Sequence, residues 1–409
     1  ESRGLGDVYK RQMLGLSLVI INRDIKEYCF PSLMAFFLIC SNSIIFPGIY
    51  TLLIAFGYVA FYKIRYGTFT IKYSKLNILF LLACYISVFS NLYIDYRILM
   101  FTGMMLICAP FYVSKKVFLF ERKILSVILL FFPVVSMIAM YCYLKGINAF
   151  AQEGVHIDLS FSAIYYHPMW LAPIAGLANV ILLWCLFQLQ NKCFRCIVLS
   201  ILLLSIYVTV VAASRTALFA SVITMVLYIV YNARNVKKII LYLLVIGFLA
   251  TISIPVYLEH STQIQNKFEG GKGEKYGSRS AHFGEGFEKL NESPLIGSGF
   301  ATAWYRGVLH KGRLESGSGW LSILFQLGAL GAIIMLFILK KVTRVFKYIR
   351  HDRRLQLFVI SLLFLCLHSC FEGYLLTVGY YIGFVFWLLI SHIICYPDMV
   401  KKYKLNFES

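Results

Sequence analysis

The sequence predicts an all-α, polytopic integral membrane protein that crosses the bilayer about twelve times. Of its 409 residues, 60% are hydrophobic and 14% are charged, whereas a soluble domain carries about 25% charged residues. Apolar runs of bilayer length recur along the chain, and lipid forces such runs into helices because it offers the backbone no hydrogen-bond partners. The low charge content argues against a nucleic-acid-binding protein despite the net charge of +20. The 34 Phe and 28 Tyr exclude a disordered chain.

The predicted spans follow from the apolar runs, each close to the roughly 20 residues that a membrane helix needs. The stretch from Tyr28 to Tyr62 is too long for one helix, and Ser41–Ser43 with Pro47–Gly48 divide it into two short spans, Tyr28–Ile45 and Ile49–Tyr62. The other ten spans are continuous: Leu76–Asn91, Ile98–Val113, Ile124–Tyr143, Met169–Gln188, Cys196–Ala212, Thr216–Tyr231, Ile239–Leu258, Trp320–Leu339, Leu355–Leu375 and Val378–Ile394.

Lysine and arginine in every second loop predict that both termini are cytoplasmic, because short cytoplasmic loops collect basic residues. With this topology the inner segments hold 28 basic and 8 acidic residues, and the outer segments hold 11 of each. The inner basic groups include Lys63, Arg122 and the run from Lys340 to Arg354. The excess charge is therefore an orientation signal. The 11 cysteines all fall in spans or on the inner side, so no disulfide framework is predicted.

The domain organisation follows from the same pattern. Residues 1–12 begin without Met and do not fit it, so we expect a remnant foreign to the natural chain, which would start at Met13. Residues 13–258 hold spans one to nine, and residues 259–319 form a large extracytoplasmic loop. Residues 320–396 hold spans ten to twelve, and residues 397–409 form a cytoplasmic tail.

The large outer loop is the first candidate for chemistry, since loops longer than about 12–15 residues are usually functional or disordered. Residues 278–291 predict an amphipathic helix with Phe283, Phe287 and Leu290 on one stripe. Pro294 and the glycines at 297 and 299 then predict a turn. We therefore expect an ordered outer domain.

Two further features carry ionisable groups. Ser214-Arg215-Thr216-Ala217 opens span eight, where the arginine would suit a diphosphate or would simply reach the interface beside a capping Ser214. Residue type alone favours the second interpretation. His368 and Glu372 are four residues apart, which predicts a shared helix face. They are either functional or a structural hydrogen bond to a neighbouring helix, and the sequence does not separate the two.

The order of several short motifs resembles the bacterial O-antigen polymerase and ligase family of polytopic glycosyltransferases. Four pieces carry the resemblance: His167-Pro-Met-Trp170, the Ser214–Ala217 motif, Arg279 followed by Glu292-Ser-Pro-Leu-Ile-Gly-Ser-Gly299, and Gly319-Trp-Leu321 followed by Gln326-Leu-Gly-Ala-Leu-Gly331. The likeness covers roughly residues 160–340, and it is the order of the pieces that makes it specific.

The resemblance implies transfer of a glycan from an undecaprenyl-diphosphate carrier on the outer face of the bacterial inner membrane. Polymerases of the family pass it to another lipid-linked repeat unit, and ligases pass it to lipid A-core. Arg215 and Arg279 match the family's outer-face arginines and are the candidates for binding the diphosphate. The ligase type has a His-Asn pair before the Gly-x-x-Gly helix, where this chain reads Glu315-Ser-Gly-Ser-Gly319. That departure favours a polymerase of O-antigen or capsule and leaves Glu315 or His310 as the catalytic base.

The remaining assignments are secondary. The secondary site candidates are Arg306, Arg313, His368, Glu372 and His167. Arg306 and Arg313 would contact the diphosphate or glycan or would be solvated loop charges, and residue type alone favours the solvated charge. We expect no cofactor and no metal, because the first outer loop lacks the acidic residues that metal-dependent lipid-linked glycosyltransferases use. The expected partners are the lipid-linked oligosaccharide, the bilayer and a chain-length regulator. The alternatives are an O-antigen ligase and a lipid-linked oligosaccharide flippase; repeated halves and ionisable groups near the midplane, typical of transporters, do not stand out in the sequence.

Overall fold

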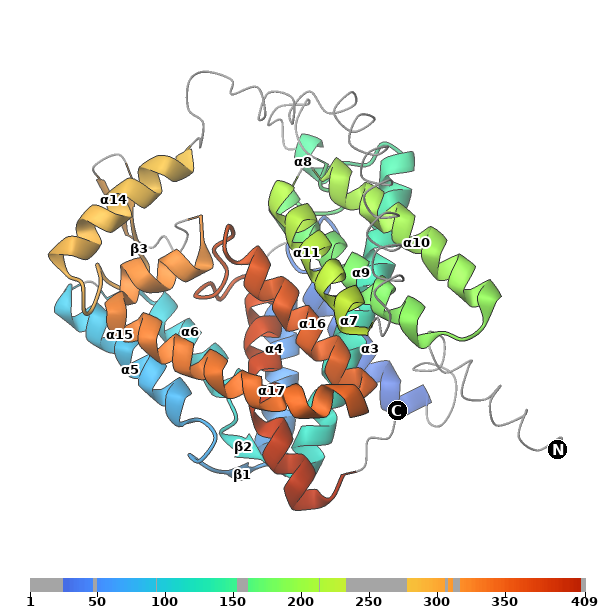
Figure 1. Ribbon diagram of the computed structural model, residues 1–409. Helices are drawn as coiled ribbons and strands as arrows, with labels where there is room; N and C mark the ends of the chain where they lie inside the picture. The colour runs from blue at the N-terminus through green and yellow to red at the C-terminus, as the bar shows by residue number, and fades with distance from the viewer. Residues whose placement is uncertain are drawn as a thin grey trace. The chain divides into compact units, whose positions relative to one another are not determined.

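A computed structural model describes residues 25–46, 50–92, 94–152, 161–212, 214–232, 278–305, 308–311 and 317–405. Over these residues the chain is helical, with only two short antiparallel strand pairs (Figure 1). The longer helices are α3 (Ile25–Ile39), α4 (Tyr50–Tyr66), α5 (Lys75–Ser90), α6 (Arg97–Cys108), α7 (Lys115–Leu144), α9 (Pro168–Gln188), α10 (Lys192–Val211), α11 (Arg215–Asn232), α14 (Ser278–Glu292), α15 (Gly319–Val342), α16 (Arg353–His368) and α17 (Tyr381–Tyr403). The short elements are α8 (Ala149–Gln152), the 3₁₀ helix η1 (Thr343–His351) and the strands β1 (Thr68–Phe69), β2 (Tyr112–Val113), β3 (Thr302–Tyr305) and β4 (Val308–Lys311).

The described helices confirm the predicted all-α membrane fold. Six of them are long and apolar enough to cross a membrane: α7, α9, α10, α11, α15 continued by η1, and α17. The shorter apolar helices include α5 and α6, and α3 and α4 lie on either side of the predicted interruption near Pro47. Span nine, Ile239–Leu258, and residues 1–12 fall outside the described residues, so the count of twelve stays a prediction.

Several predicted spans are wrong at their ends, and two of them show the reason. The span that we expected to reach Val113 ends with α6 at Cys108, since Ala109 adopts extended geometry and the next residues form β2 against β1. The span that we expected to reach Leu375 ends with α16 at His368. Long apolar runs do not reveal such ends, because the residues after the helix are as hydrophobic as those inside it.

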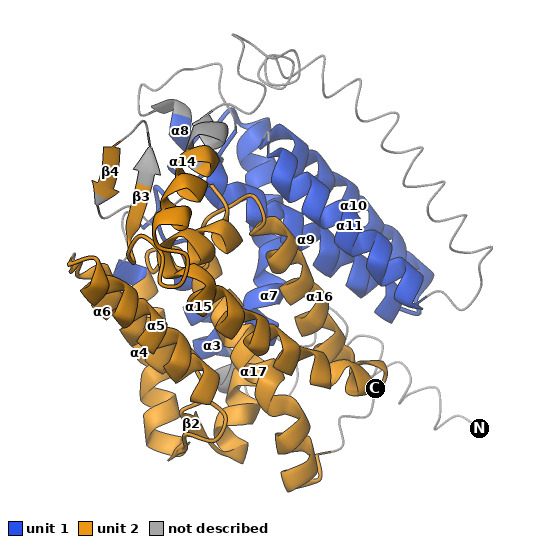
Figure 2. Cartoon of the chain, turned by 60° about the vertical axis from the view of Figure 1, so that its left-hand side comes forward, with its two compact units in different colours: residues 1–51, 126–273 blue, residues 52–125, 274–409 orange. Residues whose placement is uncertain are grey.

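The chain divides into two compact units, which Figure 2 colours separately. The first comprises residues 1–51 and 126–273, and its centre is α9, which packs against both α10 and α11. Polar side chains inside this bundle pair across helices: Asn179 Nδ2 lies 2.9 Å from Thr209 Oγ1, and Ser136 Oγ lies 2.9 Å from Ser205 Oγ. Such buried hydrogen bonds satisfy groups that lipid would leave unpaired.

The second unit comprises residues 52–125 and 274–409. In it α5 packs along α15, while α17 contacts α6, α15, α16 and η1 (Figures 1 and 2). Almost all of α17 is buried, and Trp387 lies against Phe80, Phe101 and Phe386. The apolar helix is thus a central element of this unit rather than a lipid-facing one.

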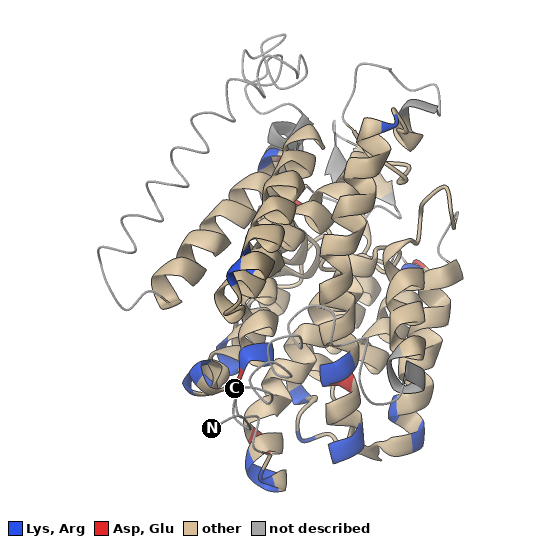
Figure 3. Cartoon of the chain, turned by 90° about the vertical axis from the view of Figure 1, so that its right-hand side faces the viewer, with Lys and Arg blue, Asp and Glu red and all other residues tan. Residues whose placement is uncertain are grey.

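Lys, Arg, Asp and Glu take up few positions along the helical ribbon, as Figure 3 shows by colour. Two basic residues that we assigned to inner loops are instead buried inside helices. Lys63 on α4 is 1% exposed and Arg122 on α7 is 5% exposed. Both are paired with acids, so they contribute no surface charge to the orientation signal.

Candidate functional site

Arg215 occupies the first position of α11 in the first unit. Ser214 Oγ accepts a hydrogen bond from the backbone N–H of Ala217 at 3.3 Å, so the serine caps this helix as its position suggested. The side chain of Arg215 is exposed. The arginine therefore adds its charge to the end of a helix that already carries a partial positive charge.

His167 caps α9 at the same end of the bundle. Short connections join α9 to α10 and α10 to α11, so α9 and α11 start at one end of the bundle. A hydrogen bond of 3.4 Å from Phe161 N–H to Val211 O also ties the segment before α9 to the end of α10. Two helix N-termini and Arg215 therefore occupy one end of this unit, an arrangement that favours an anion.

The imidazole of His167 is neutral in this role. Its Nδ1 accepts the backbone N–H of Met169 at 3.1 Å, and the ring of Phe150 lies 5.3 Å away, edge to face. Burial lowers the pKa of His167, even though part of the side chain reaches the surface. A capping Nδ1 must be unprotonated to accept a hydrogen bond, so the lowered pKa and the cap agree.

In the second unit the predicted amphipathic helix is present as α14 (Ser278–Glu292). It packs against β3 and α15, with the Phe287 ring 5.0 Å from that of Phe325 and Gly286 directly against the same ring. A side chain at Gly286 would collide with Phe325. The helix that carries Arg279 is therefore held closely on α15, although the side chain of Arg279 lies outside the described residues.

The hairpin of β3 and β4 carries His310. Its backbone register pairs Ala303 with His310, and the histidine side chain is half-buried. Arg306, Arg313 and Glu315 lie outside the described residues. Because β3 contacts α14, the structure brings the elements that hold Arg279 and His310 into one substructure of this unit.

This substructure is fixed to a break in α15. Gly328 has φ +62° and ψ −163°, so the helix is interrupted there. The predicted turn, residues 294–301, fills the break, and we call these residues together with 325–330 the loop–helix joint. Four backbone hydrogen bonds form it: Ser298 N–H to Phe325 O (2.8 Å), Gly299 N–H to Gln326 O (3.2 Å), Ala329 N–H to Pro294 O (2.8 Å) and Leu330 N–H to Leu295 O (3.1 Å).

Glycines make this close approach achievable. A Cβ on Gly297 would lie 2.5 Å from the carbonyl carbon of Gln326, and a Cβ on Gly328 would lie 2.4 Å from that of Leu295. Both glycines also have positive φ. Non-helical backbone at membrane depth persists only where protein groups satisfy it, and here residues 294–299 supply hydrogen-bond partners for the broken helix.

The expected shared helix face of His368 and Glu372 is wrong. The helix α16 ends at His368, and the chain then turns so that the carbonyls of Ser369 and Glu372 accept the N–H of Gly319 at 2.8 and 3.0 Å. His368 is buried and stacks between Phe364 and Tyr374, with ring centroids 5.6 Å away in each case. This turn caps the start of α15, a few residues after Glu315, and no motif in the sequence predicts that contact.

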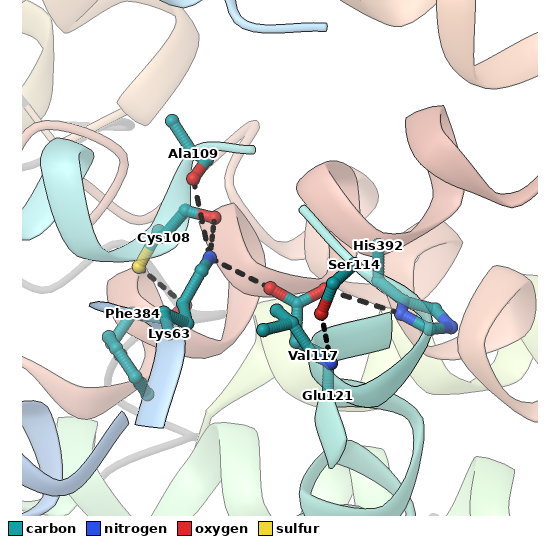
Figure 4. A network of polar contacts seen from close by, with 8 residues as sticks. All are labelled: Lys63, Cys108, Ala109, Ser114, Val117, Glu121, Phe384 and His392. Carbon is teal, nitrogen blue, oxygen red and sulfur yellow. Dashed lines mark hydrogen bonds and ion pairs between the residues drawn. The ribbon is translucent and has the colours of Figure 1, made fainter. Parts of the chain in front are cut away.

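The sequence also missed a buried group of charges, which we call the charged cluster. Lys63 Nζ lies 2.7 Å from Glu121 Oε1, and His392 Nδ1 lies 3.5 Å from the other carboxylate oxygen (Figure 4). The next residue on α7, Arg122, makes two hydrogen bonds to Asp352, at 2.6 and 2.8 Å. Asp352 also accepts the hydroxyl of Tyr396 at 2.6 Å.

The cluster joins α4, α7, α17 and the start of α16 into one balanced network. A signal for it was present, because Glu121 and Asp352 are single acids inside strongly basic segments. Across the described residues, no three His, Cys, Asp or Glu side chains gather in a group that would hold a metal ion.

Comparison with known proteins supports the predicted resemblance. The model of the family described as O-antigen ligase matches residues 199–336. The match runs from α10 to α15 and contains Arg215, Arg279, His310 and Glu315, whereas His167, His368 and Glu372 lie beyond it. No curated protein and no solved structure matches the chain.

Proposed function

We propose that the chain is a glycosyltransferase of the O-antigen polymerase and ligase family, and specifically a polymerase of O-antigen or capsule. It would transfer a glycan from undecaprenyl diphosphate to a lipid-linked repeat unit on the outer face of the bacterial inner membrane. The observation that carries the proposal is that the matched segment contains both candidate arginines, of which Arg215 lies at the convergent starts of α9 and α11. Such an end suits a diphosphate.

The residues then have distinct roles. The acceptor hydroxyl attacks the anomeric carbon, the bond from that carbon to the diphosphate oxygen breaks, and the acceptor proton passes to His310 or Glu315. Arg215 and Arg279 would stabilise the charge that develops on the departing diphosphate. Arg306, Arg313 and His167 are candidates for further contacts to the glycan or the diphosphate.

A ligase that transfers the glycan to lipid A-core is the second candidate, since it is the activity in the description of the matched family. We favour the polymerase because residues 315–319, Glu-Ser-Gly-Ser-Gly, lack the His-Asn pair of the ligase type. The products separate the two: a polymerase yields a ladder of lengthened lipid-linked glycans without lipid A-core. A flippase would instead leave single repeat units on the inner leaflet when it is deleted.

The test is complementation of a deletion strain with Arg215→Ala and Arg279→Ala, followed by gel analysis of surface polysaccharide. Removal of one group that stabilises developing charge typically lowers the rate about 10²- to 10³-fold, so both variants should lose long polymer. Arg353→Ala is a matched control, because Arg353 is also an exposed arginine at the first position of a capped helix. Full ladders from both test variants would overturn the site, and the same assay on Glu315→Gln and His310→Ala identifies the base.

A further inference from the structure

Gln326 is the residue on which the loop–helix joint converges. Its side-chain Oε1 accepts the backbone N–H of Ala301 at 3.0 Å, and its backbone carbonyl accepts both the N–H of Gly299 and the hydroxyl of Ser87 on α5. The residue is 1% exposed. One buried residue therefore contacts both α5 and residues 299–301: its backbone carbonyl reaches Ser87 and Gly299, and its side-chain amide reaches Ala301.

The side-chain bond reaches a strained point of the chain. Ala301 has φ +61°, which is in the left-handed region that non-glycine residues rarely adopt. Such a conformation costs on the order of 1–3 kcal/mol and persists only where neighbouring groups enforce it. The partner that enforces it here is Gln326, through the N–H of Ala301 itself.

The hairpin that carries His310 starts at the next residue. Thr302 begins β3, and Ala303 pairs with His310 across the hairpin. The direction in which the chain leaves Ala301 therefore sets the direction of β3 and, through the register, the position of β4. Gln326 holds the chain at Ala301, directly before β3 begins. The helix α14 contacts the same strand.

A polar side chain at this place needs an explanation, since the amide lies within a helix that is apolar enough to span the membrane. Burying an amide without a partner is costly, and a leucine would satisfy the packing of a helix interior equally well. The neighbouring backbone bonds of the joint need no side chain. Within the joint, the amide of Gln326 provides the acceptor for the N–H of Ala301.

We propose that Gln326 is a positioning residue that fixes the β3–β4 hairpin, and with it His310, on the broken helix α15. This inference rests on the proposed function for its catalytic consequence, but the anchoring itself does not. Gln326 acts through Ala301 and does not contact the reacting groups. It should therefore influence the turnover of bound substrate more than the binding of the lipid carrier.

The experiment compares Gln326→Met, which keeps the length but loses the acceptor, with Gln326→Glu, which keeps an oxygen acceptor. Gln356→Met is the matched control, because Gln356 is also buried on an apolar helix, α16. Hydrogen–deuterium exchange is measured in detergent for peptides covering 299–305 and, as an internal reference, the α9 segment. Polymer formation is then measured with each purified protein and a lipid-linked repeat unit.

We expect Gln326→Met to exchange about tenfold faster at 299–305, the factor that corresponds to about 1.4 kcal/mol, and to lower kcat with little change in KM. Gln326→Glu should recover both, and Gln356→Met should change neither. Unchanged exchange in Gln326→Met overturns the anchoring role. Faster exchange with wild-type kcat overturns the catalytic consequence. If wild-type protein forms no polymer, the proposed function fails while the exchange experiment still decides the anchoring.

Discussion

The second unit buries polar groups in two places that differ in chemistry. In the charged cluster, Lys63 on α4 pairs with Glu121 on α7 at 2.7 Å. Arg122 on α7 pairs with Asp352, at the start of α16, at 2.6 and 2.8 Å. In the loop–helix joint, neutral backbone groups of residues 294–301 pair with those of the broken helix α15. Neither the loop nor the helix segment of the joint contains a titratable side chain.

The two regions depend on different features of the chain for their stability. A buried ion pair is stable only while it is complete, because a single charge left behind has no compensation. The joint depends instead on the absence of side chains at Gly297 and Gly328, where a Cβ would meet backbone atoms. The first region should therefore be sensitive to loss of a partner and to pH, and the second to the addition of a single methyl group.

The largest expected effect comes from breaking the charged cluster. Lys63→Met leaves Glu121 buried with only His392 beside it, and removal of one partner from a buried pair costs about 3–5 kcal/mol. The double variant Lys63→Met/Glu121→Leu should recover most of that loss, because an apolar pair of similar volume is often neutral. Thermal unfolding in detergent measures both.

Arg344→Met is the control for this pair. Arg344 also lies near an acid, 3.7 Å from Asp398, but the two side chains are 54% and 32% exposed, and exposed ion pairs are worth about 0–1 kcal/mol. If Lys63→Met is no more destabilising than Arg344→Met, the cluster does not stabilise this unit.

The next largest effect should come from the joint. Gly328→Ala would force a Cβ to 2.4 Å from the Leu295 carbonyl carbon at a position with positive φ. Strain and overpacking of this kind each cost about 1–3 kcal/mol, so we expect lower thermal stability and loss of polymer. Gly103→Ala on α6, where a Cβ meets nothing within 4 Å, is the control. Equal behaviour of the two variants would show that the loop does not need this close approach.

The sequence predicted the loop–helix joint far better than the charged cluster. The amphipathic helix, the turn at Pro294 and the glycines of the joint were visible because they depend on local pattern and on residues with special backbone geometry. The helix break at Gly328 was not, since its cause is hydrogen bonding to a segment about 30 residues earlier. The turn after His368 was hidden for the same reason: its partner, Gly319, is distant in sequence.

The charged cluster shows a second limit. Lys63 and Arg122 fit the rule for cytoplasmic loops, and a count of charges cannot distinguish a solvated lysine from one buried against Glu121. The only sign of pairing in the sequence was that Glu121 and Asp352 are single acids inside strongly basic segments. For the candidate site, the residue types and the order of the family motifs could be read from the sequence, and the structure adds the local settings of Arg215, His167 and His310.

The smallest expected effect is a difference in pH dependence: the contribution of the charged cluster to thermal stability should change with pH, and that of the joint should not. Burial alone would raise the pKa of Asp352, but the hydrogen bonds and charge of Arg122 outweigh it and lower that pKa below its ordinary value of 3.8. A lowered folded-state pKa means that the unfolded chain binds the proton more readily, so the contribution of Asp352 is complete above about pH 5 and is lost as the pH falls through the folded value. We expect wild-type thermal stability to fall between pH 5 and 3 by about 1 kcal/mol more than that of Asp352→Asn, which keeps a cap for Leu355 N–H but no titratable group. Gly328→Ala, which changes only the uncharged joint, should keep the wild-type pH slope; if it flattens the slope as Asp352→Asn does, the two regions are not independent.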